Sequence, residues 1–337
     1  YAINNGVNYF DTAYIYHEGK SEEAFAISLS KYERNTYYVA DKLPLWECEI
    51  ESDMETIFNE QLRRLNVEYF DFYLAHSLSD DNYMLFEKFN TYNFLLRKKE
   101  EGKIKNIGFS FHGNPELLET ILSKYKFDFA QIQLNYYDWT VQRAKEQYEI
   151  LLKYNTPCIV MEGARGGFLS SFNDEINNLL ITSRPTYSVT SWAFRWLISL
   201  PNVYVVLSGM SNMEQVIDNV DTFTKHEKYT EDDYKTLDSL LVMSNKNKSI
   251  PCTGCRYCMD CSFGVNIPLV FSAYNDYQKT KNDFMLSVTY DQTMKASEKA
   301  NNCKNCGICK PKCPQNIDIP KELKRVQSEV EDIISKF

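Results

Sequence analysis

The chain has 337 residues, of which 44% are hydrophobic, enough to bury one large core and a second, smaller one. A formal net charge of -9, with no basic stripe, argues against nucleic acid as a partner. No apolar run approaches the roughly 18 residues of a membrane span, and the first residues do not resemble a signal peptide. We therefore expect a cytoplasmic protein without a membrane partner.

Short apolar runs alternate with longer amphipathic stretches over residues 1–245, which predicts a parallel β-sheet covered by helices. The predicted strands are residues 7–12, 37–42, 69–75, 104–109, 129–133, 158–161 and 203–207. The stretch 52–65 has apolar side chains at helical spacing and is a representative predicted helix.

These strand–helix units predict a (β/α)8 TIM barrel, an α/β fold, over residues 1–245. Residues 1–5, followed by Gly6, have the pattern of the last turn of a helix with a glycine stop. The first strand is therefore expected to be absent from the given chain, which would be truncated at its N-terminus. A doubly wound open sheet is the alternative, and it is weakened because no G-x-G-x-x-G follows a predicted strand.

Polar residues stand at the C-terminal ends of successive predicted strands, where the chemistry of such a barrel is found. Asp11 ends the first strand and Tyr16 follows it, whereas Lys42 ends the second strand and His76 follows the third. Each residue alone fits a structural role, such as a helix cap or a packing ring. Together, four chemically complementary groups predict a catalytic site.

The ten cysteines are distributed unevenly, with Cys48 and Cys158 isolated and expected to be buried apolar side chains. The other eight form two groups with spacings C-x2-C-x2-C-x2-C and C-x2-C-x2-C-x3-C-P. These residues are Cys252, Cys255, Cys258, Cys261, Cys303, Cys306, Cys309 and Cys313. The second spacing matches the bacterial ferredoxin pattern for [4Fe–4S] clusters, because short spacers bring three thiolates to three irons.

Disulfides do not explain such clustering in a cytosolic chain, and zinc usually takes paired C-x2-C knuckles. We therefore expect two [4Fe–4S] clusters with these eight cysteines as metal ligands. Cys261 follows a two-residue spacer and precedes Ser262 instead of a proline. The spacing therefore does not decide which of the two clusters Cys261 ligates. We favour crossed ligation, in which Cys261 joins the second group and Cys313 joins the first. Uncrossed ligation is the alternative.

The two groups end in similar phrases, Cys261 to Pro268 and Cys313 to Pro320, which form a short internal repeat. The segment between the groups has a helical composition, and residues 321–337 carry apolar side chains at helical spacing. We expect a mainly α-helical ferredoxin-like domain over residues 246–337.

The segments 6–16, 39–44 and 69–76 resemble the aldo-keto reductases, and the whole chain resembles a subgroup with a C-terminal [4Fe–4S] module. The resemblance implies a tetrad of Asp11, Tyr16, Lys42 and His76. Tyr16 would donate a proton to a carbonyl oxygen, Lys42 would lower the pKa of Tyr16, and His76 would orient the carbonyl.

The resemblance also implies a nicotinamide cofactor, held by Ser110 and Gln131, with its adenosine end at residues 208–219. Within that segment the implied cofactor-binding residues are Gly209, Ser211, Gln215 and Asn219. The chain departs from the family at Phe111, where asparagine is usual, and at Ser211 and Asn212, where many members have a lysine or arginine. These departures leave NADP and NAD both open.

Three functions fit these features. The first is an enzyme that transfers hydride between a nicotinamide and a small carbonyl or alcohol substrate, with clusters that exchange electrons with ferredoxin or another carrier. The second is an electron-transfer protein whose barrel no longer uses nicotinamide. The third is a carbonyl reductase with purely structural clusters. We favour the first.

Overall fold

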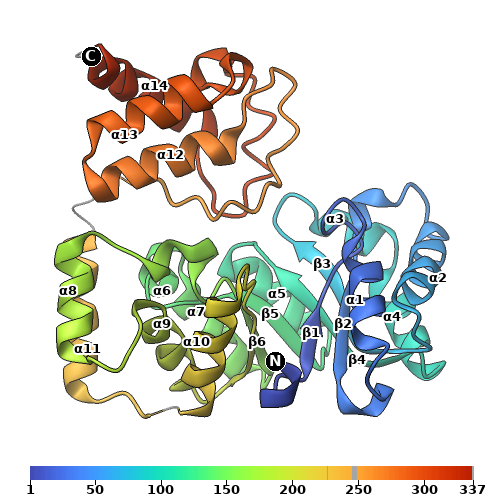
Figure 1. The fold of residues 1–337 in the computed structure, drawn as a ribbon. Coiled ribbons are helices and arrows are strands. Elements are labelled where there is room, and N and C mark those ends of the chain that lie inside the picture. The colour runs from blue at the N-terminus through green and yellow to red at the C-terminus, as the bar shows by residue number, and fades with distance from the viewer. Residues whose placement is uncertain (226, 245–248, 336–337) are drawn as a thin grey trace. The chain divides into compact units, whose positions relative to one another are not determined.

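The computed structural model describes residues 1–225, 227–244 and 249–335 (Figure 1). The chain divides into two compact units. The first, called here the barrel unit, comprises Tyr1–Gly163 and Phe194–Lys228, and the second, the cysteine unit, comprises Ala164–Ala193 and Tyr229–Phe337. The predicted domain boundary between residues 245 and 246 lies outside the described residues.

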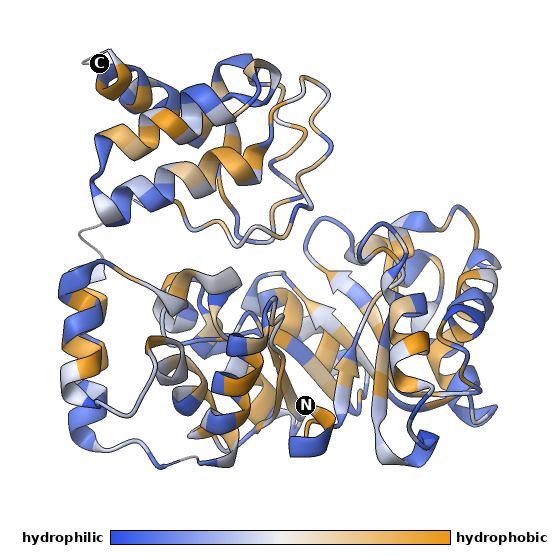
Figure 2. Ribbon diagram, viewed as in Figure 1, coloured by the Kyte–Doolittle hydropathy of each residue, from blue (hydrophilic) through white to orange (hydrophobic). Residues whose placement is uncertain are grey.

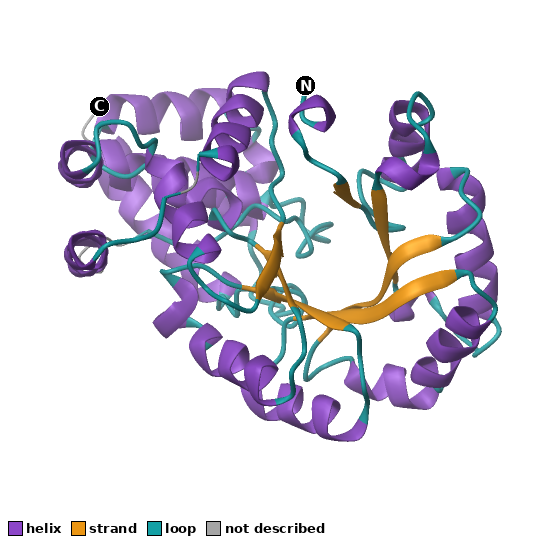
Figure 3. Cartoon of the chain, turned by 90° about the horizontal axis from the view of Figure 1, so that it is seen from below, coloured by secondary structure: helices purple, strands orange, loops and turns teal. Residues whose placement is uncertain are grey.

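The barrel unit is built on a sheet of seven strands that pair in their order along the chain. The strands are β1 (Tyr9–Asp11), β2 (Tyr38–Leu43), β3 (Phe70–Leu78), β4 (Ile104–Phe111), β5 (Phe129–Gln133), β6 (Cys158–Met161) and β7 (Val203–Val206). Every neighbouring pair is parallel. The sheet curves into a nearly closed barrel with helices on its outer side, as predicted (Figure 3). The open doubly wound sheet is wrong, because its strand order would reverse at a switch point.

Helices connect these strands. They are α1 (Ser21–Leu29), α2 (Asp53–Leu65), α3 (Tyr83–Lys88), α4 (Thr91–Glu100), α5 (Pro115–Lys124), α6 (Asp138–Val141), α7 (Ala144–Lys153), α9 (Val189–Ile198) and α10 (Met213–Thr224). Local sequence signals mark where several of these helices begin. Asn114 caps α5 by accepting the N–H of Leu117, and Pro115 begins the helix without losing a hydrogen bond.

The core of the barrel lies between its strands, which are largely hydrophobic (Figure 2). Ala40, Leu74, Phe129 and Ile159 form one cluster of buried side chains from four strands. Gly108 in β4 makes room for it, because a Cβ there would lie 2.5 Å from the ring of Phe129. The central strands are therefore fixed by packing as well as by their hydrogen bonds.

The cysteine unit is mainly helical. Its helices are α8 (Asp174–Ser183), α11 (Glu231–Ser244), α12 (Ile267–Thr280), α13 (Asp283–Ser287) and α14 (Ile319–Ile334), with a π-helical turn at Val288–Thr293. The helix predicted at residues 321–337 begins two residues earlier, at Ile319, and residues 336 and 337 lie outside the described part of the chain. Among the helices that the structure describes, none has the length and apolar character needed to cross a bilayer.

One hydrophobic core unites α12 and α14 with the cysteine loops. Phe271 and Tyr274 of α12 are buried in it together with Val326 and Val330 of α14. Six of the eight clustered cysteines, which are partly buried, pack against this core: Cys252, Cys258, Cys261, Cys303, Cys309 and Cys313. The cysteines are thus part of the packing of this unit.

Candidate active site and cysteine clusters

The four residues of the predicted tetrad lie at the C-terminal end of the first three strands. Asp11 is the last residue of β1, Lys42 lies near the end of β2, and His76 lies near the end of β3. Tyr16 lies in the turn between β1 and α1. Because all the strands are parallel, their C-terminal ends meet at one rim of the barrel.

A buried ion pair forms the base of this site. Lys42 Nζ lies 2.5 Å from Asp11 Oδ1 and donates a second hydrogen bond of 2.6 Å to the carbonyl oxygen of Thr12. The Lys42 side chain is 0% exposed and that of Asp11 is 13% exposed. A buried amino group needs such partners, so Asp11 and Thr12 fix the position of Lys42 Nζ.

The two remaining members lie next to this pair. Lys42 Nζ is 4.7 Å from the centre of the Tyr16 ring, and the Tyr16 and His76 rings meet edge to face with centroids 5.9 Å apart. The structure therefore brings Tyr16, Lys42 and His76 together, with Asp11 behind Lys42.

Burial shifts the titration of two members in useful directions. Burial raises the pKa of the Asp11 carboxyl, and the charge of Lys42 opposes that rise. Burial lowers the pKa of His76 well below its ordinary value, and the charge of Lys42 lowers it further. His76 is thus a neutral imidazole near pH 7, able to donate a hydrogen bond without carrying charge.

Two aromatic neighbours of His76 escaped the sequence analysis. The Trp46 ring lies 5.0 Å from that of His76, and His112, whose pKa burial lowers to about 4, also acts on His76. Trp46 follows β2 and His112 follows β4, so their position just after strand ends is the signal that could have identified them.

A buried polar network behind Lys42 was also missed. Gln61 of α2 donates to the carbonyl oxygen of Lys42 at 3.0 Å and accepts from the Tyr73 hydroxyl at 2.5 Å. Gln61 and Tyr73 are both 0% exposed. This network fixes the backbone that carries Lys42, and the local sequence of α2 does not identify these partners.

The two residues predicted to contact nicotinamide are paired in the sheet. Ser110 of β4 lies opposite Gln131 of β5, and both are buried. The Ser110 hydroxyl accepts the N–H of Ser77 at 2.7 Å. Gln131 Oε1 is buried and has no hydrogen-bond partner within the described residues, which fits an acceptor kept for a bound amide.

The segment 208–219 forms a turn into α10. Ser211 N donates to Gln215 Oε1 at 2.7 Å, and Asn219 Nδ2 donates to Ser208 Oγ at 2.9 Å. The predicted residues Ser211, Gln215 and Asn219 are therefore used to shape the turn itself. Gly209 leaves open space on its side-chain face, since a Cβ there would meet nothing within 4 Å.

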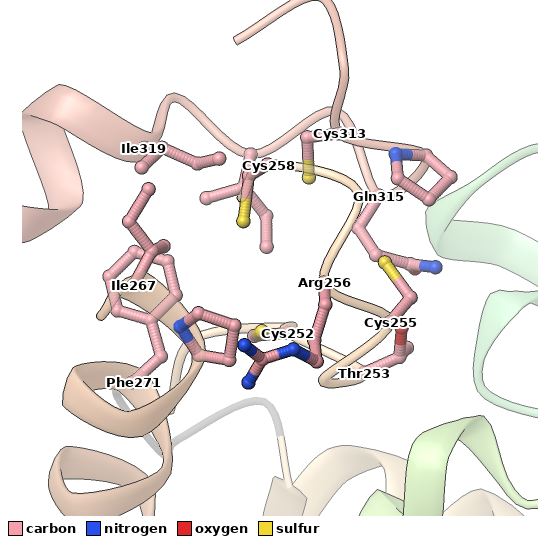
Figure 4. Close-up of a pocket in the computed structure, with 13 residues that line it drawn as sticks. Cys252, Thr253, Cys255, Arg256, Cys258, Ile267, Phe271, Cys313, Gln315 and Ile319 are labelled. Atoms are coloured by element: carbon pink, nitrogen blue, oxygen red, sulfur yellow. The ribbon is translucent and has the colours of Figure 1, made fainter. Parts of the chain in front are cut away.

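In the cysteine unit, thiols from both groups line one cavity. Its walls carry Cys252, Cys255 and Cys258 of the first group and Cys313 of the second, with Ile267, Phe271 and Ile319 on the apolar side (Figure 4). Burial raises the pKa of the Cys258 thiol to about 12, and the neighbouring Cys255, Cys252 and Cys313 raise it further. Cys313 thus lies with the first group.

The remaining four thiols form a second set. The pKa of Cys309 is raised by burial and by its neighbours Cys303, Cys306 and Cys261. Cys261 thus lies near the second group, which agrees with the crossed hypothesis. Within the described residues no three His, Cys, Asp or Glu side chains approach closely enough to share a single metal ion. Cys48 and Cys158 are buried free thiols, as predicted.

Comparison with known proteins agrees with both units. Residues 1–242 match the model of the aldo/keto reductase family. The chain belongs to the aldo/keto reductase family. Residues 251–318 of this aldo/keto reductase also match the model of a 4Fe-4S dicluster domain.

Curated relatives of this reductase are oxidoreductases. It is 24% identical over 269 residues to the uncharacterized oxidoreductase YqkF of Bacillus subtilis, covering 71% of this chain and 84% of that one. It is 26% identical over 272 residues to the aldehyde reductase YPR1 of Saccharomyces cerevisiae, covering 71% of this chain and 80% of the relative. The protein is an oxidoreductase enzyme of this family.

Solved structures share the barrel. An aldo/keto reductase from Klebsiella pneumoniae, in complex with NADP and acetate, matches with a TM-score of 0.60 and 19% identity over 71% of this chain and 82% of that one. The holo form of the aldo-keto reductase AKR11C1 from Bacillus halodurans matches with a TM-score of 0.60 and 22% identity, over 71% of this chain and 84% of the other. At these identities the likeness concerns the fold.

Proposed function

We propose that this aldo/keto reductase transfers hydride between a nicotinamide cofactor and a small carbonyl or alcohol substrate, and that two [4Fe–4S] clusters connect the reaction to a one-electron carrier such as ferredoxin. The observation that supports the proposed hydride transfer is the buried Lys42–Asp11 pair, which lies against Tyr16 beside a neutral His76. Free thiols in this number also suit a reducing compartment such as the cytoplasm.

The tetrad residues divide the proton chemistry among them. A free phenol has a pKa of about 10, too high for a ready proton donor near neutral pH. The Lys42 ammonium next to Tyr16 favours the phenolate, so Tyr16 releases its proton to the carbonyl oxygen more easily. The neutral His76 donates a hydrogen bond that orients the same oxygen. In the reverse direction Tyr16 accepts the proton of the alcohol.

The residues at the barrel rim fit a nicotinamide, which when bound supplies or accepts the hydride. Gln131 Oε1 offers a buried acceptor for the carboxamide, and Ser110 lies opposite on the next strand. The turn at residues 208–212 leads into the N-terminus of α10, where backbone N–H groups favour a phosphate. Since Ser211 and Asn212 carry no positive charge and Glu214 follows them, this turn offers no cation for a 2′-phosphate.

The thiols fit two clusters with crossed ligation. Cys252, Cys255, Cys258 and Cys313 would hold one cluster, and Cys261, Cys303, Cys306 and Cys309 the other. Clusters held by these thiols would exchange electrons singly with a one-electron carrier.

Anaerobic purification tests the proposal, followed by iron and sulfide analysis and by titration with NADH and NADPH. We expect about eight irons and about eight sulfides per chain, the content of two [4Fe–4S] clusters. We also expect nicotinamide-dependent reduction of a model aldehyde such as para-nitrobenzaldehyde. A colourless protein that contains zinc would overturn the cluster assignment, and the absence of turnover with either nucleotide would overturn the hydride chemistry.

A further inference from the structure

The two cysteine loops repeat each other closely, so one serves as the reference for the other. The N–H of Gly254 donates to Cys252 Sγ at 3.4 Å, and the N–H of Asn305 donates to Cys303 Sγ at 3.4 Å. After the last cysteine of each loop, an Ile-Pro pair begins α12 or α14. Hydrogen bonds to sulfur tune the potential of a cluster, and these two bonds are matched.

The loops differ two residues after the last cysteine. Gln315 follows Cys313 and is 6% exposed, whereas Phe263 follows Cys261 at the same place and is 42% exposed. Gln315 Oε1 accepts a hydrogen bond of 3.4 Å from Arg165 Nη2. The cavity lined by Cys252, Cys255, Cys258 and Cys313 therefore has a cation beside one of its cysteine segments. Phe263, at the matching place after Cys261, has no side-chain group that could accept such a hydrogen bond.

Arg165 is a buried cation. It is 0% exposed, begins the short 3-10 helix Arg165–Ser170, and lies with its guanidinium 5.6 Å from the centre of the Phe168 ring. Its guanidinium brings a positive charge into the interior of the cysteine unit. Gln315, which binds Arg165, is the second residue after Cys313 and lines the same cavity as that thiol.

The backbone next to Arg165 is pressed against the first cysteine loop. A Cβ at Gly166 would lie 2.2 Å from the carbonyl oxygen of Thr253 and 2.6 Å from its Cα. Thr253 is the residue between Cys252 and Gly254. Because two backbones are in contact here, Arg165 has a fixed position relative to the loop.

We infer that Arg165 raises the reduction potential of the cluster held by Cys252, Cys255, Cys258 and Cys313 and leaves the other cluster unchanged. One-electron reduction adds one negative charge to the cluster, and a buried cation stabilises that charge because water screens it little. This inference rests on the proposed presence of both clusters.

The test is a redox titration with dithionite, followed by electron paramagnetic resonance, on the anaerobic protein and three variants. Arg165→Gln should make reduction of one cluster about tenfold less favourable, which is about 59 mV for one electron. Arg165→Lys keeps the charge and should retain most of the potential. Lys235→Gln is the control, because Lys235 is exposed on α11, pairs with Asp232 at 2.8 Å outside the cysteine loops and should leave both potentials unchanged.

The double variant Arg165→Gln with Cys261→Ser assigns the affected cluster, since the cluster that remains there should show the shifted potential. Unchanged potentials in Arg165→Gln, or equal shifts of both clusters, would overturn the inference. Loss of iron in Arg165→Gln but not in Arg165→Lys would support a role for the charge, whereas loss in both would show a purely structural arginine and overturn it. A wild-type protein without iron and sulfide would instead contradict the proposed function.

Discussion

The barrel unit and the cysteine unit hold their functional side chains in different ways. Asp11, Lys42 and His76 lie on three strands of one sheet. Parallel hydrogen bonding to the neighbouring strands sets the positions of these strands. The cysteines lie on irregular segments before α12 and α14, with turns and one shared core as their support. The tetrad is thus formed by the fold itself, whereas we expect the cysteine loops to gain part of their order from the clusters proposed for them.

This contrast predicts that changes in the tetrad alter chemistry without altering the fold, and the largest effect should come from Tyr16. Tyr16→Phe removes the proton donor, so turnover of para-nitrobenzaldehyde should fall about 10²- to 10⁴-fold. Iron content and cluster spectra should not change. Tyr14→Phe is the matched control, because Tyr14 donates a hydrogen bond of 2.9 Å to Glu60 and is not a member of the tetrad. This variant should stay active. Full turnover in Tyr16→Phe would sink the proposed mechanism.

Changes at the cysteines should do the opposite and remove clusters while the barrel remains folded. Cys258→Ser and Cys261→Ser should each lose about half of the iron, because each removes one ligand of a different cluster. Crossed ligation makes a sharper prediction for double variants. Cys261→Ser with Cys309→Ser should lose a single cluster, whereas Cys258→Ser with Cys261→Ser should lose both.

Iron analysis and electron paramagnetic resonance measure these losses, with Cys158→Ala as a control that keeps both clusters, because Cys158 is buried in β6. The opposite pattern in the two double variants would establish uncrossed ligation. A nicotinamide-dependent reductase activity that survives loss of either cluster would favour structural clusters.

The ion pair behind Tyr16 predicts a pH dependence that belongs to the barrel alone. Burial raises the pKa of Asp11, so its carboxylate takes up a proton at a higher pH than an ordinary aspartate. As the pH falls through that value, Lys42 loses its partner, and kcat should fall on the acid side. Asp11→Asn should lower kcat about tenfold or more, because Lys42 loses the partner that fixes it next to Tyr16, and should lack this acid transition. His76, whose pKa burial lowers, should add no transition near its ordinary value.

The profile of kcat between acid and neutral pH measures this effect in the wild type and in Asp11→Asn. An acid transition that persists unchanged in the variant would assign it to another group and contradict the role given to Asp11.

A smaller effect is expected where the barrel meets the cofactor. Gln131→Ala removes a buried acceptor, and one hydrogen bond contributes about 0.5–1.5 kcal/mol, so KM for the nicotinamide should rise about two- to tenfold. Gln147→Ala is a suitable control, because Gln147 is also buried but donates to the carbonyl oxygen of Gly113. An unchanged KM would show that Gln131 does not touch the cofactor.

Local patterns in the sequence predicted much of this arrangement. The strand positions followed from apolar runs, and the tetrad followed from polar residues at strand ends, because parallel strands bring their C-terminal ends to one rim. The cysteine spacing predicted two groups. Spacing alone did not decide between crossed and uncrossed ligation by Cys261 and Cys313, because that depends on how the two loops fold onto α12 and α14.

Contacts between distant segments were beyond the reach of the sequence. Gln61 supports Lys42 from 19 positions away, and Arg165 meets Gln315 across 150 positions. Neither residue lies in a motif that names its partner. A polar residue on an otherwise apolar helix face, such as Gln61 in α2, signals that some buried partner exists but does not identify it.

The smallest predicted effect concerns stability in the cysteine unit outside its loops. Arg184 forms two hydrogen bonds of 2.8 Å with Asp233 and so joins the end of α8 to the start of α11. This pairing lowers the pKa of Asp233 to about 2, so the stabilisation is complete at neutral pH and is lost as the pH falls through that value. Asp233→Asn should lower the free energy of unfolding by about 1 kcal/mol at neutral pH, discounted for solvent screening, and leave iron content unchanged.

Asp232→Asn is the matched control for this pair, because the Asp232 side chain is 88% exposed and its ion pair with Lys235 lies in water. Asp232→Asn should change the free energy of unfolding, measured by thermal unfolding, by no more than about 0.5 kcal/mol. If Asp233→Asn proved as mild as Asp232→Asn, the contact between α8 and α11 would not depend on the ion pair. If Asp233→Asn instead released iron, the helices of the cysteine unit and its cysteine loops would unfold together. The loops of this unit would then depend on the stability of α8 and α11 as well as on their clusters.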